Sequence, residues 1–153
     1  MMNEKDMQIL SMLRKNGRET LTVMSKETQI PISTIFDKVA KFNRKIITKY
    51  TGLVDFQELG FNARASVMIK ANPSTKERLY DYLSNHQNVN SIYKINNGFD
   101  FMVDIVFRNV RNLEEFLQTL EDKYRTKDRI VYYIIDEMKQ EEFLTNPDVM
   151  NMV

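Results

Sequence analysis

Hydrophobic residues in the first third of the chain repeat at helical spacing in three stretches. Residues 4–16 carry a wide apolar stripe that stops at Asn16-Gly17, a shorter stripe follows a capping threonine and ends near residue 28, and a third stripe opens at Pro31. On a period of 3.6 residues the third stripe places on one face Ile32, Ile35, Phe36, Val39 and Phe42. A brief turn at Gln29-Ile30 separates the last two stretches. The pattern predicts three helices, the second capped by Thr20 or Thr22 and joined to the third as a helix-turn-helix.

The opposite side of the third predicted helix is polar and cationic. Between Lys38 and Lys49 there are five basic residues and no acidic one. In a helix-turn-helix the last helix enters the major groove, and a basic face suits the phosphate backbone. A solvated helix face, or a three-helix bundle that binds nothing, remains the alternative. On the DNA-binding interpretation the candidates that read bases or contact phosphates are Ser33, Thr34, Asp37, Lys38, Lys41, Arg44, Lys45 and Lys49.

A β-like run follows the third helix. Residues 46–56 contain Gly52 and predict a strand or small hairpin, which after a third helix is a wing. Lys45 and Lys49 would hold the DNA backbone at its base. Residues 57–60 predict a short helical turn that ends on a glycine. We therefore place the end of the first domain, a winged helix-turn-helix with its linker, at residue 60.

The rest of the chain alternates between the strand period and the helix period. Helices are predicted after Ser74 or Thr75 and from a capping Asn112 to Tyr124. Strands are predicted over residues 61–71, 89–95, 99–107 and 130–138. This order is the ferredoxin-like βαββαβ unit. We expect an α+β fold, with this second domain at residues 61–142 and a tail at residues 143–153 that is either frayed or an extra contact in the assembly of several copies.

One face of the predicted sheet is left without helices. It mixes polar with large apolar residues, and such a face is usually buried by something else. A second copy of the chain is the simplest cover and gives a two-fold dimer with two reading heads, while a solvated face on a monomer is the alternative. The residues expected on this face are Arg64, Ser66, Met68, Tyr93, Met102, Asp104, Val106, Tyr132 and Ile134.

Composition narrows the class of protein. The chain has 153 residues, 42% of them hydrophobic, and a net charge of +1. Residues 1–60 carry ten Lys and Arg against seven Asp and Glu, whereas the remainder carries twelve against fourteen, so the front is the basic half. There is no cysteine, no apolar run of about 20 residues and no apolar core of a signal peptide. We expect a soluble cytoplasmic protein without disulfides.

The sequence contains no recognisable set of catalytic residues. The single histidine, His86, lies at the end of a predicted helix and is expected to face solvent. No cysteine nucleophile, phosphate-binding glycine loop or Ser-His-Asp spacing is present. Asp100 could bind an amino group or stabilise its own turn. We therefore expect no catalytic residues, no metal site and no cofactor.

A series of short motifs runs along almost the whole chain. They are Asp6 with Ile9-Leu10, Gly17-Arg18, Ser25-Lys26, Ser33-Thr34-Ile35, Lys38-Val39, Val54-Asp55, Leu59-Gly60, Phe99-Asp100-Phe101 and Asp136 to Gln140. In this order they resemble the leucine-responsive regulatory protein/AsnC (Lrp/AsnC) family of transcription regulators, from about Glu4 to Gln140. The third helix departs from the family at Ile30-Pro31-Ile32, where a Ser-Pro is usual. The signature turn has its glycine moved by one, at Asn97-Gly98, where Asn97 can take the positive φ.

The resemblance implies a sequence-specific DNA-binding regulator that works as a homodimer, or as a tetramer or octamer. It also implies an effector, usually an amino acid, bound between C-terminal domains at Asn97, Gly98, Phe99 and Asp100. Two other readings stay open. One is an enzyme on the same fold that resembles siroheme decarboxylases, and the other is an amino-acid sensor that does not bind DNA.

Overall fold

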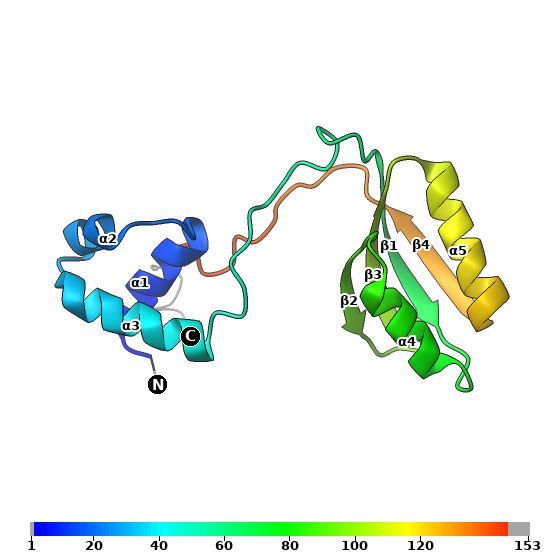
Figure 1. Ribbon diagram of the computed structural model, residues 1–153, viewed down its shortest axis with the longest axis horizontal. Helices are drawn as coiled ribbons and strands as arrows, with labels where there is room; N and C mark the ends of the chain where they lie inside the picture. The colour runs from blue at the N-terminus through cyan, green and yellow to red at the C-terminus, as the bar shows by residue number, and fades with distance from the viewer. Residues whose placement is uncertain (1, 147–153) are drawn as a thin grey trace. The chain divides into compact units, whose positions relative to one another are not determined.

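The computed structural model describes residues 2–146 (Figure 1). The chain divides into two compact units: the segment up to Leu53 together with the segment from Met138 on, and Val54–Glu137. These divisions lie a few residues before the boundaries predicted after residues 60 and 142. Among the described residues, no helix is long and apolar enough to cross a membrane.

The N-terminal unit contains three helices, α1 (Glu4–Lys15), α2 (Leu21–Thr28) and α3 (Ile32–Lys45). Thr20 caps α2 by accepting the N–H of Val23, which confirms one of the two predicted caps. The three helices share one apolar core, whose buried members are Ile9, Leu10, Leu13, Met24, Ile30, Ile35 and Phe42.

The turn between α2 and α3 is held by local hydrogen bonds. Gln29 takes a left-handed φ of 58°, and its N–H donates to the carbonyl of Ser25. The Ser25 hydroxyl then donates to the carbonyl of Ile30 at 2.6 Å, while the Ile30 side chain is buried. The helix that follows begins directly after Pro31, as predicted. These contacts fix the helix-turn-helix.

An ion pair ties α3 to α1. The Lys38 ammonium contacts the carboxylate of Asp6, and both side chains are largely buried. The other Asp6 oxygen accepts the N–H of Asn3 in a capping box at the start of α1. The hydrogen bond from Lys38 is the main cause that lowers the pKa of Asp6 below its ordinary value.

The predicted wing is wrong. Residues 46–56 contain no strand, and the N–H groups of Ile46 and Ile47 both donate to the carbonyl of Phe42, which closes α3. A strand needs a partner, and the described part of the chain supplies none for this segment. The predicted turn over residues 57–60 is present, and Gly60 has a φ of +80°.

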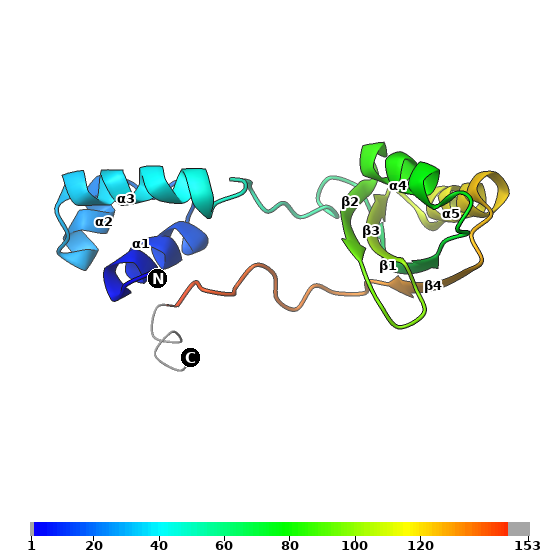
Figure 2. The same ribbon diagram turned by 90° about the horizontal axis from the view of Figure 1, so that it is seen from below.

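The C-terminal unit is a four-stranded antiparallel sheet with two helices on one face (Figures 1 and 2). Its strands are in the order β2-β3-β1-β4. This confirms the predicted α+β, ferredoxin-like βαββαβ arrangement. Its elements are β1 (Ala63–Lys70), α4 (Lys76–Asn85), β2 (Val89–Lys94), β3 (Phe101–Phe107), α5 (Val110–Tyr124) and β4 (Asp128–Tyr133).

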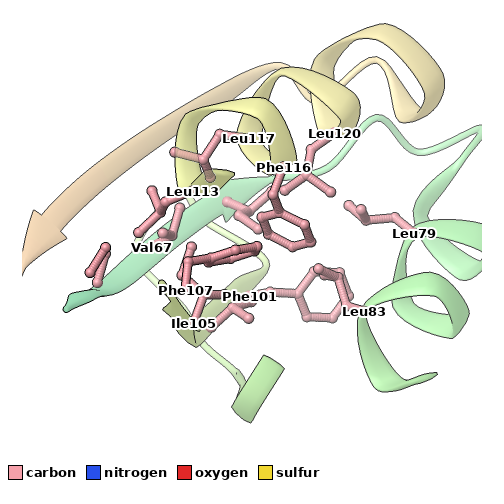
Figure 3. Packing of buried hydrophobic residues seen from close by; sticks show 14 of the residues in the cluster. Val67, Leu79, Leu83, Phe101, Ile105, Phe107, Leu113, Phe116, Leu117 and Leu120 are labelled. Atoms are coloured by element: carbon pink, nitrogen blue, oxygen red, sulfur yellow. The ribbon is translucent and has the colours of Figure 1, made fainter. Parts of the chain in front are cut away.

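The core of this unit lies between the sheet and its helices (Figure 3). Every second residue of β1 and β3 is buried on that side, because side chains alternate along a strand. Leucines and Phe116 of α5, with Leu79 and Leu83 of α4, close the core from the helix side. The alternation therefore fixes which sheet face the helices cover.

Several element boundaries differ from the prediction by one or two residues, and two differences are larger or have a clear local cause. Helix α5 begins at Val110 rather than after Asn112, because Asn109 is the cap and accepts the N–H of Asn112. Strand β4 ends at Tyr133, and no regular element follows it up to residue 146. Both differences concern where an element starts or stops, which periodicity defines poorly.

The C-terminal segment contacts the N-terminal unit through Arg14 of α1. Arg14 Nε donates to the carbonyl of Phe143 at 3.0 Å, and the guanidinium pairs with the Glu141 carboxylate at 3.1 Å. Phe143, the first residue of the predicted tail, thus makes a contact within the chain, whereas the tail had been expected to be frayed or to contact another copy. Residues 147–153 of the predicted tail lie outside the described residues.

We expect Asp6→Asn to lower the free energy of unfolding at pH 7 and to have a smaller effect at low pH. The folded pKa of Asp6 is depressed, so its carboxylate stabilises the fold above the unfolded pKa of about 3.9. That contribution is lost as the pH falls through the lower folded pKa. Urea unfolding of both proteins at pH 7 and about pH 2.5 measures the difference. Asp81→Asn, an exposed change on α4, is the control, and an equal loss at both pH values for Asp6→Asn would contradict the assignment.

Candidate nucleic-acid interface

The exposed side of α3 brings together most of the predicted DNA-binding residues. Ser33 and Asp37 of its first turns are exposed, and Thr34 is half-buried at the edge. The cations of its second half are exposed as well, at Lys41, Arg44 and Lys45. None of these cations forms an ion pair within the described part of the chain. Their charges are available to an external anion.

Lys38 does not belong to this surface. Its side chain is only 22% exposed, and its ammonium points to Asp6 of α1. Position 38 lies on the flank of α3 that faces α1, so a nearby carboxylate captures it. Lys38 therefore positions α3 within the unit, whereas the sequence predicted a contact with phosphate or a base edge.

Two residues of the predicted apolar face of α3 are exposed. Phe36 is 61% exposed and Ile32 is 47% exposed, whereas Ile35 and Phe42 are fully buried. The five apolar positions span roughly 120° of arc at 100° per residue, and the two neighbouring helices cover only part of it. Periodicity alone does not reveal which edge of such a stripe stays outside.

Lys49 lies away from α3, on a cavity of about 790 Å³ within the N-terminal unit. Lys15 and Arg18, from the end of α1 and the turn after it, line the same cavity. The Tyr50 ring packs on Gly17 there, 3.3 Å from where a Cβ would lie. Neither Lys15 nor Arg18 was predicted to contact DNA, and their position beside Lys49 adds cations to this side of the unit.

The predicted effector residues form the connection between β2 and β3. Asn97 has a φ of 63° and Gly98 a φ of +88°, so Asn97 does take the positive φ that the sequence required. Both residues are exposed, and Phe99 is half-buried. The turn therefore exposes the peptide groups of Asn97 and Gly98 and the side-chain amide of Asn97 to solvent.

Asp100 is already engaged within the unit. One carboxylate oxygen accepts from the Lys76 ammonium at 2.6 Å, and the other accepts the N–H of Ala71 at 2.8 Å. The bond from Lys76 is the largest cause that lowers the pKa of Asp100. These contacts join the residue before β3 to the loop after β1 and to the first residue of α4, so Asp100 has a structural role within the unit.

His86 packs among aromatic rings and does not simply face solvent as expected. It is half-buried, its ring centroid lies 4.7 Å from that of Phe116, and its Nδ1 accepts the N–H of Asn88. Burial lowers the pKa of His86. Among the described residues, no group of three or more His, Cys, Asp or Glu is placed to hold a metal ion.

The sheet face without helices carries the residues that alternation predicted. Met68 is paired with Met102, which is paired with Tyr93, and Ser66 is paired with Tyr132. Tyr132 is 54% exposed, and no described element of the C-terminal unit covers this face (Figure 2). Arg64 on the same face pairs with Glu137, and its Nε is buried without a hydrogen-bond partner among the residues that the structure describes.

Comparison with known proteins connects these features to a family. Residues 64–142, just over half of the chain, match the family model of the Lrp/AsnC ligand binding domain. The HTH-type transcriptional regulator FL11 of Pyrococcus abyssi is 27% identical over 120 residues, which cover 78% of this chain and 80% of that protein. An uncharacterised HTH-type transcriptional regulator of Pyrococcus furiosus is 31% identical over 126 residues, covering 80% and 81% of the two chains.

Solved structures share the fold across both units. Bacillus subtilis LrpC matches with a TM-score of 0.83 at 19% identity, over 91% of this chain and 98% of that one. A transcriptional regulator of Neisseria meningitidis, solved as a complex with L-Met, matches with a TM-score of 0.84 at 16% identity, over 92% and 94%. At such identities the likeness concerns the fold alone. The sequence matches go further: this chain belongs to the Lrp/AsnC family, as a sequence-specific DNA-binding transcription regulator with an effector-binding domain and not as an enzyme.

Proposed function

We propose that this regulator contacts DNA through the exposed side of α3. The observation that carries the proposal is a set of exposed cations, Lys41, Arg44 and Lys45, on the last helix of a helix-turn-helix, none of which forms an ion pair within residues 2–146. In this arrangement the start of the helix approaches base edges and the cations neutralise phosphates. Ser33, Thr34 and Asp37 then lie nearest the bases. Lys49, with Lys15 and Arg18, extends the phosphate contacts beyond the helix.

The working unit is proposed to be a homodimer formed through the open sheet face. Large exposed side chains such as Tyr93 and Tyr132 favour burial against a second copy. The unpartnered Nε of Arg64 would gain an acceptor there. A two-fold dimer carries two copies of α3, as paired half-sites require. Dimers that associate further would give the tetramers or octamers considered from the sequence.

An amino acid is the proposed effector, bound near the β2–β3 connection. The C-terminal unit matches a ligand-binding domain, and the Neisseria protein of the same fold was solved with L-Met. Asn97 and Gly98 are exposed and supply polar groups, while Asp100 holds the turn through Lys76. The protein would act in the cytoplasm, where it meets chromosomal DNA.

Salt dependence tests the DNA surface. The affinity of the full chain for its own upstream DNA should fall steeply with salt, with a log–log slope of about −0.9 per phosphate neutralised. Lys41→Ala or Arg44→Ala should weaken binding and reduce the steepness by about 0.9 per contact, or about 1.8 in a dimer. Lys38→Ala should lower stability and leave the slope unchanged. Fluorescence anisotropy at several salt concentrations gives the slopes.

The matched control for these changes is Lys123→Ala, an exposed helical lysine of the C-terminal unit. If the salt dependence of DNA affinity has the same slope for Lys123→Ala and Lys41→Ala, Lys41 on α3 does not contact the phosphates. If wild type selects no DNA from a random pool but does bind amino acids, the protein is a sensor that does not bind DNA.

Sedimentation equilibrium tests the dimer. Wild type should have at least twice the chain mass of 18.2 kDa. Tyr132→Asp places a charge on the open face and should shift the mass toward the monomer. Val110→Asp makes the same change at an exposed position on the first turn of α5 and should leave the mass unchanged. A wild-type monomer, or an unaffected Tyr132→Asp protein, argues against this interface.

Thermal unfolding tests the effector. At 100 times its dissociation constant, a bound amino acid stabilises the folded chain by about 2.7 kcal/mol, so at least one of the 20, with L-Met tested first, should raise the midpoint. Asn97→Gly keeps the left-handed backbone but removes the amide, and it should reduce that rise. A midpoint that no amino acid changes would refute the effector proposal.

A further inference from the structure

The first six residues of α3 lack the side chains that usually distinguish base pairs, and the lysine that follows them, Lys38, is held by Asp6. Residues 32–37 read Ile-Ser-Thr-Ile-Phe-Asp, with no Arg, Lys, Asn or Gln. Guanine is most often read by Arg or Lys, and adenine by Asn or Gln, through two hydrogen bonds in the major groove. Ser33, Thr34 and Asp37 supply hydrogen-bonding groups of lower selectivity or reach. Another kind of contact has to carry much of the discrimination here.

Ile32 and Phe36 are placed to make that contact. They are one helical turn apart, so their side chains lie on the same side of α3. The core does not use them, since the burial on this helix comes from Ile35 and Phe42. Ser33 directly follows Ile32 in the sequence, and Asp37 directly follows Phe36. The apolar pair therefore belongs to the same end of α3 as the polar residues proposed to face the bases.

The charge around the pair favours DNA over an apolar protein partner. The same helix carries Lys41, Arg44 and Lys45 without ion-pair partners in the described part of the chain. An occupant must match both a cationic surface and an apolar one. The major groove offers phosphates along its rims and the C5-methyl group of thymine on its floor, where apolar side chains such as Phe contact it.

We propose that Ile32 and Phe36 form an apolar reading pair that recognises thymine C5-methyl groups in the major groove. The inference rests on the proposed function, in which the start of α3 approaches base edges. It assigns to this chain a preference for thymine at the base pairs that face its first two turns. Phe36, the more exposed of the two, makes the larger contribution.

Uracil provides the test, because it pairs as thymine does but lacks the methyl group. The full wild-type chain first selects duplexes from a random pool, and the best duplex is remade with deoxyuridine at one thymine position at a time. At a contacted position wild type should lose about fourfold in affinity, the factor for losing one methyl-sized apolar contact. At the thymine that Phe36 contacts, Phe36→Ala should bind the thymine and uracil duplexes equally. Ile32→Ala should lose the preference at a different thymine.

Two variants sharpen the comparison. Phe36→Leu keeps an apolar side chain and should retain part of the thymine preference. Leu59→Ala removes an equally exposed apolar residue from the other unit and should keep the full wild-type ratio. The ratio of affinities for the two duplexes also cancels any loss of active protein.

Each result decides a different question. A wild type that shows no loss with uracil, or a Phe36→Ala protein that shows the same loss as wild type, overturns the reading pair while leaving DNA binding intact. A change of mass in sedimentation for Phe36→Ala, with the uracil ratio unaltered, assigns the residue to a protein contact instead. A wild type that enriches no sequence overturns the proposed DNA surface itself.

Discussion

Strand alternation is the constraint on which the C-terminal unit depends. Each strand must send successive side chains to opposite faces, and only two helices are available to cover the sheet. Placing both helices on one face buries the alternate residues of β1 and β3 in a single core. The same choice leaves tyrosines and methionines on the other face. The surface proposed for assembly is thus the unavoidable complement of the core.

The N-terminal unit resolves a similar conflict on a single helix. Helix α3 has to be fixed to the unit and, on the proposed function, must still expose enough of its surface to bind DNA. Ile35 and Phe42 fix it through the core, and Lys38 fixes it through Asp6. This leaves the remaining cations and the two apolar residues of its first turns outside. From residue type alone, Lys38 would be expected at the surface and Phe36 in the core. In the structure Lys38 anchors the helix and Phe36 is exposed.

The sequence predicted what local periodicity determines. The helix-turn-helix, the order of strands and helices, the two sheet faces and the positive φ of Asn97 all follow from spacing and from the conformational preferences of single residues. Features that depend on distant neighbours were missed. Residues 46–56 have strand composition but no partner to pair with, Lys38 meets a carboxylate 32 positions away, and His86 enters an aromatic cluster made by other elements. Asn109 and Asn112 can both cap a helix, and in the structure Asn109 caps α5.

The contact between Arg14 and the C-terminal segment has a consequence for how the chain is made. Its two side chains are separated by 127 positions, so the acceptors for Arg14 leave the ribosome long after α1, α2 and α3 have been synthesised. The three helices have their whole apolar core by then and can fold with Arg14 still hydrated, since an exposed ion pair adds little stability. Once Glu141 has emerged, its carboxylate neutralises a positive charge on α1. A nascent DNA-binding unit is therefore more cationic around α1 than the mature one.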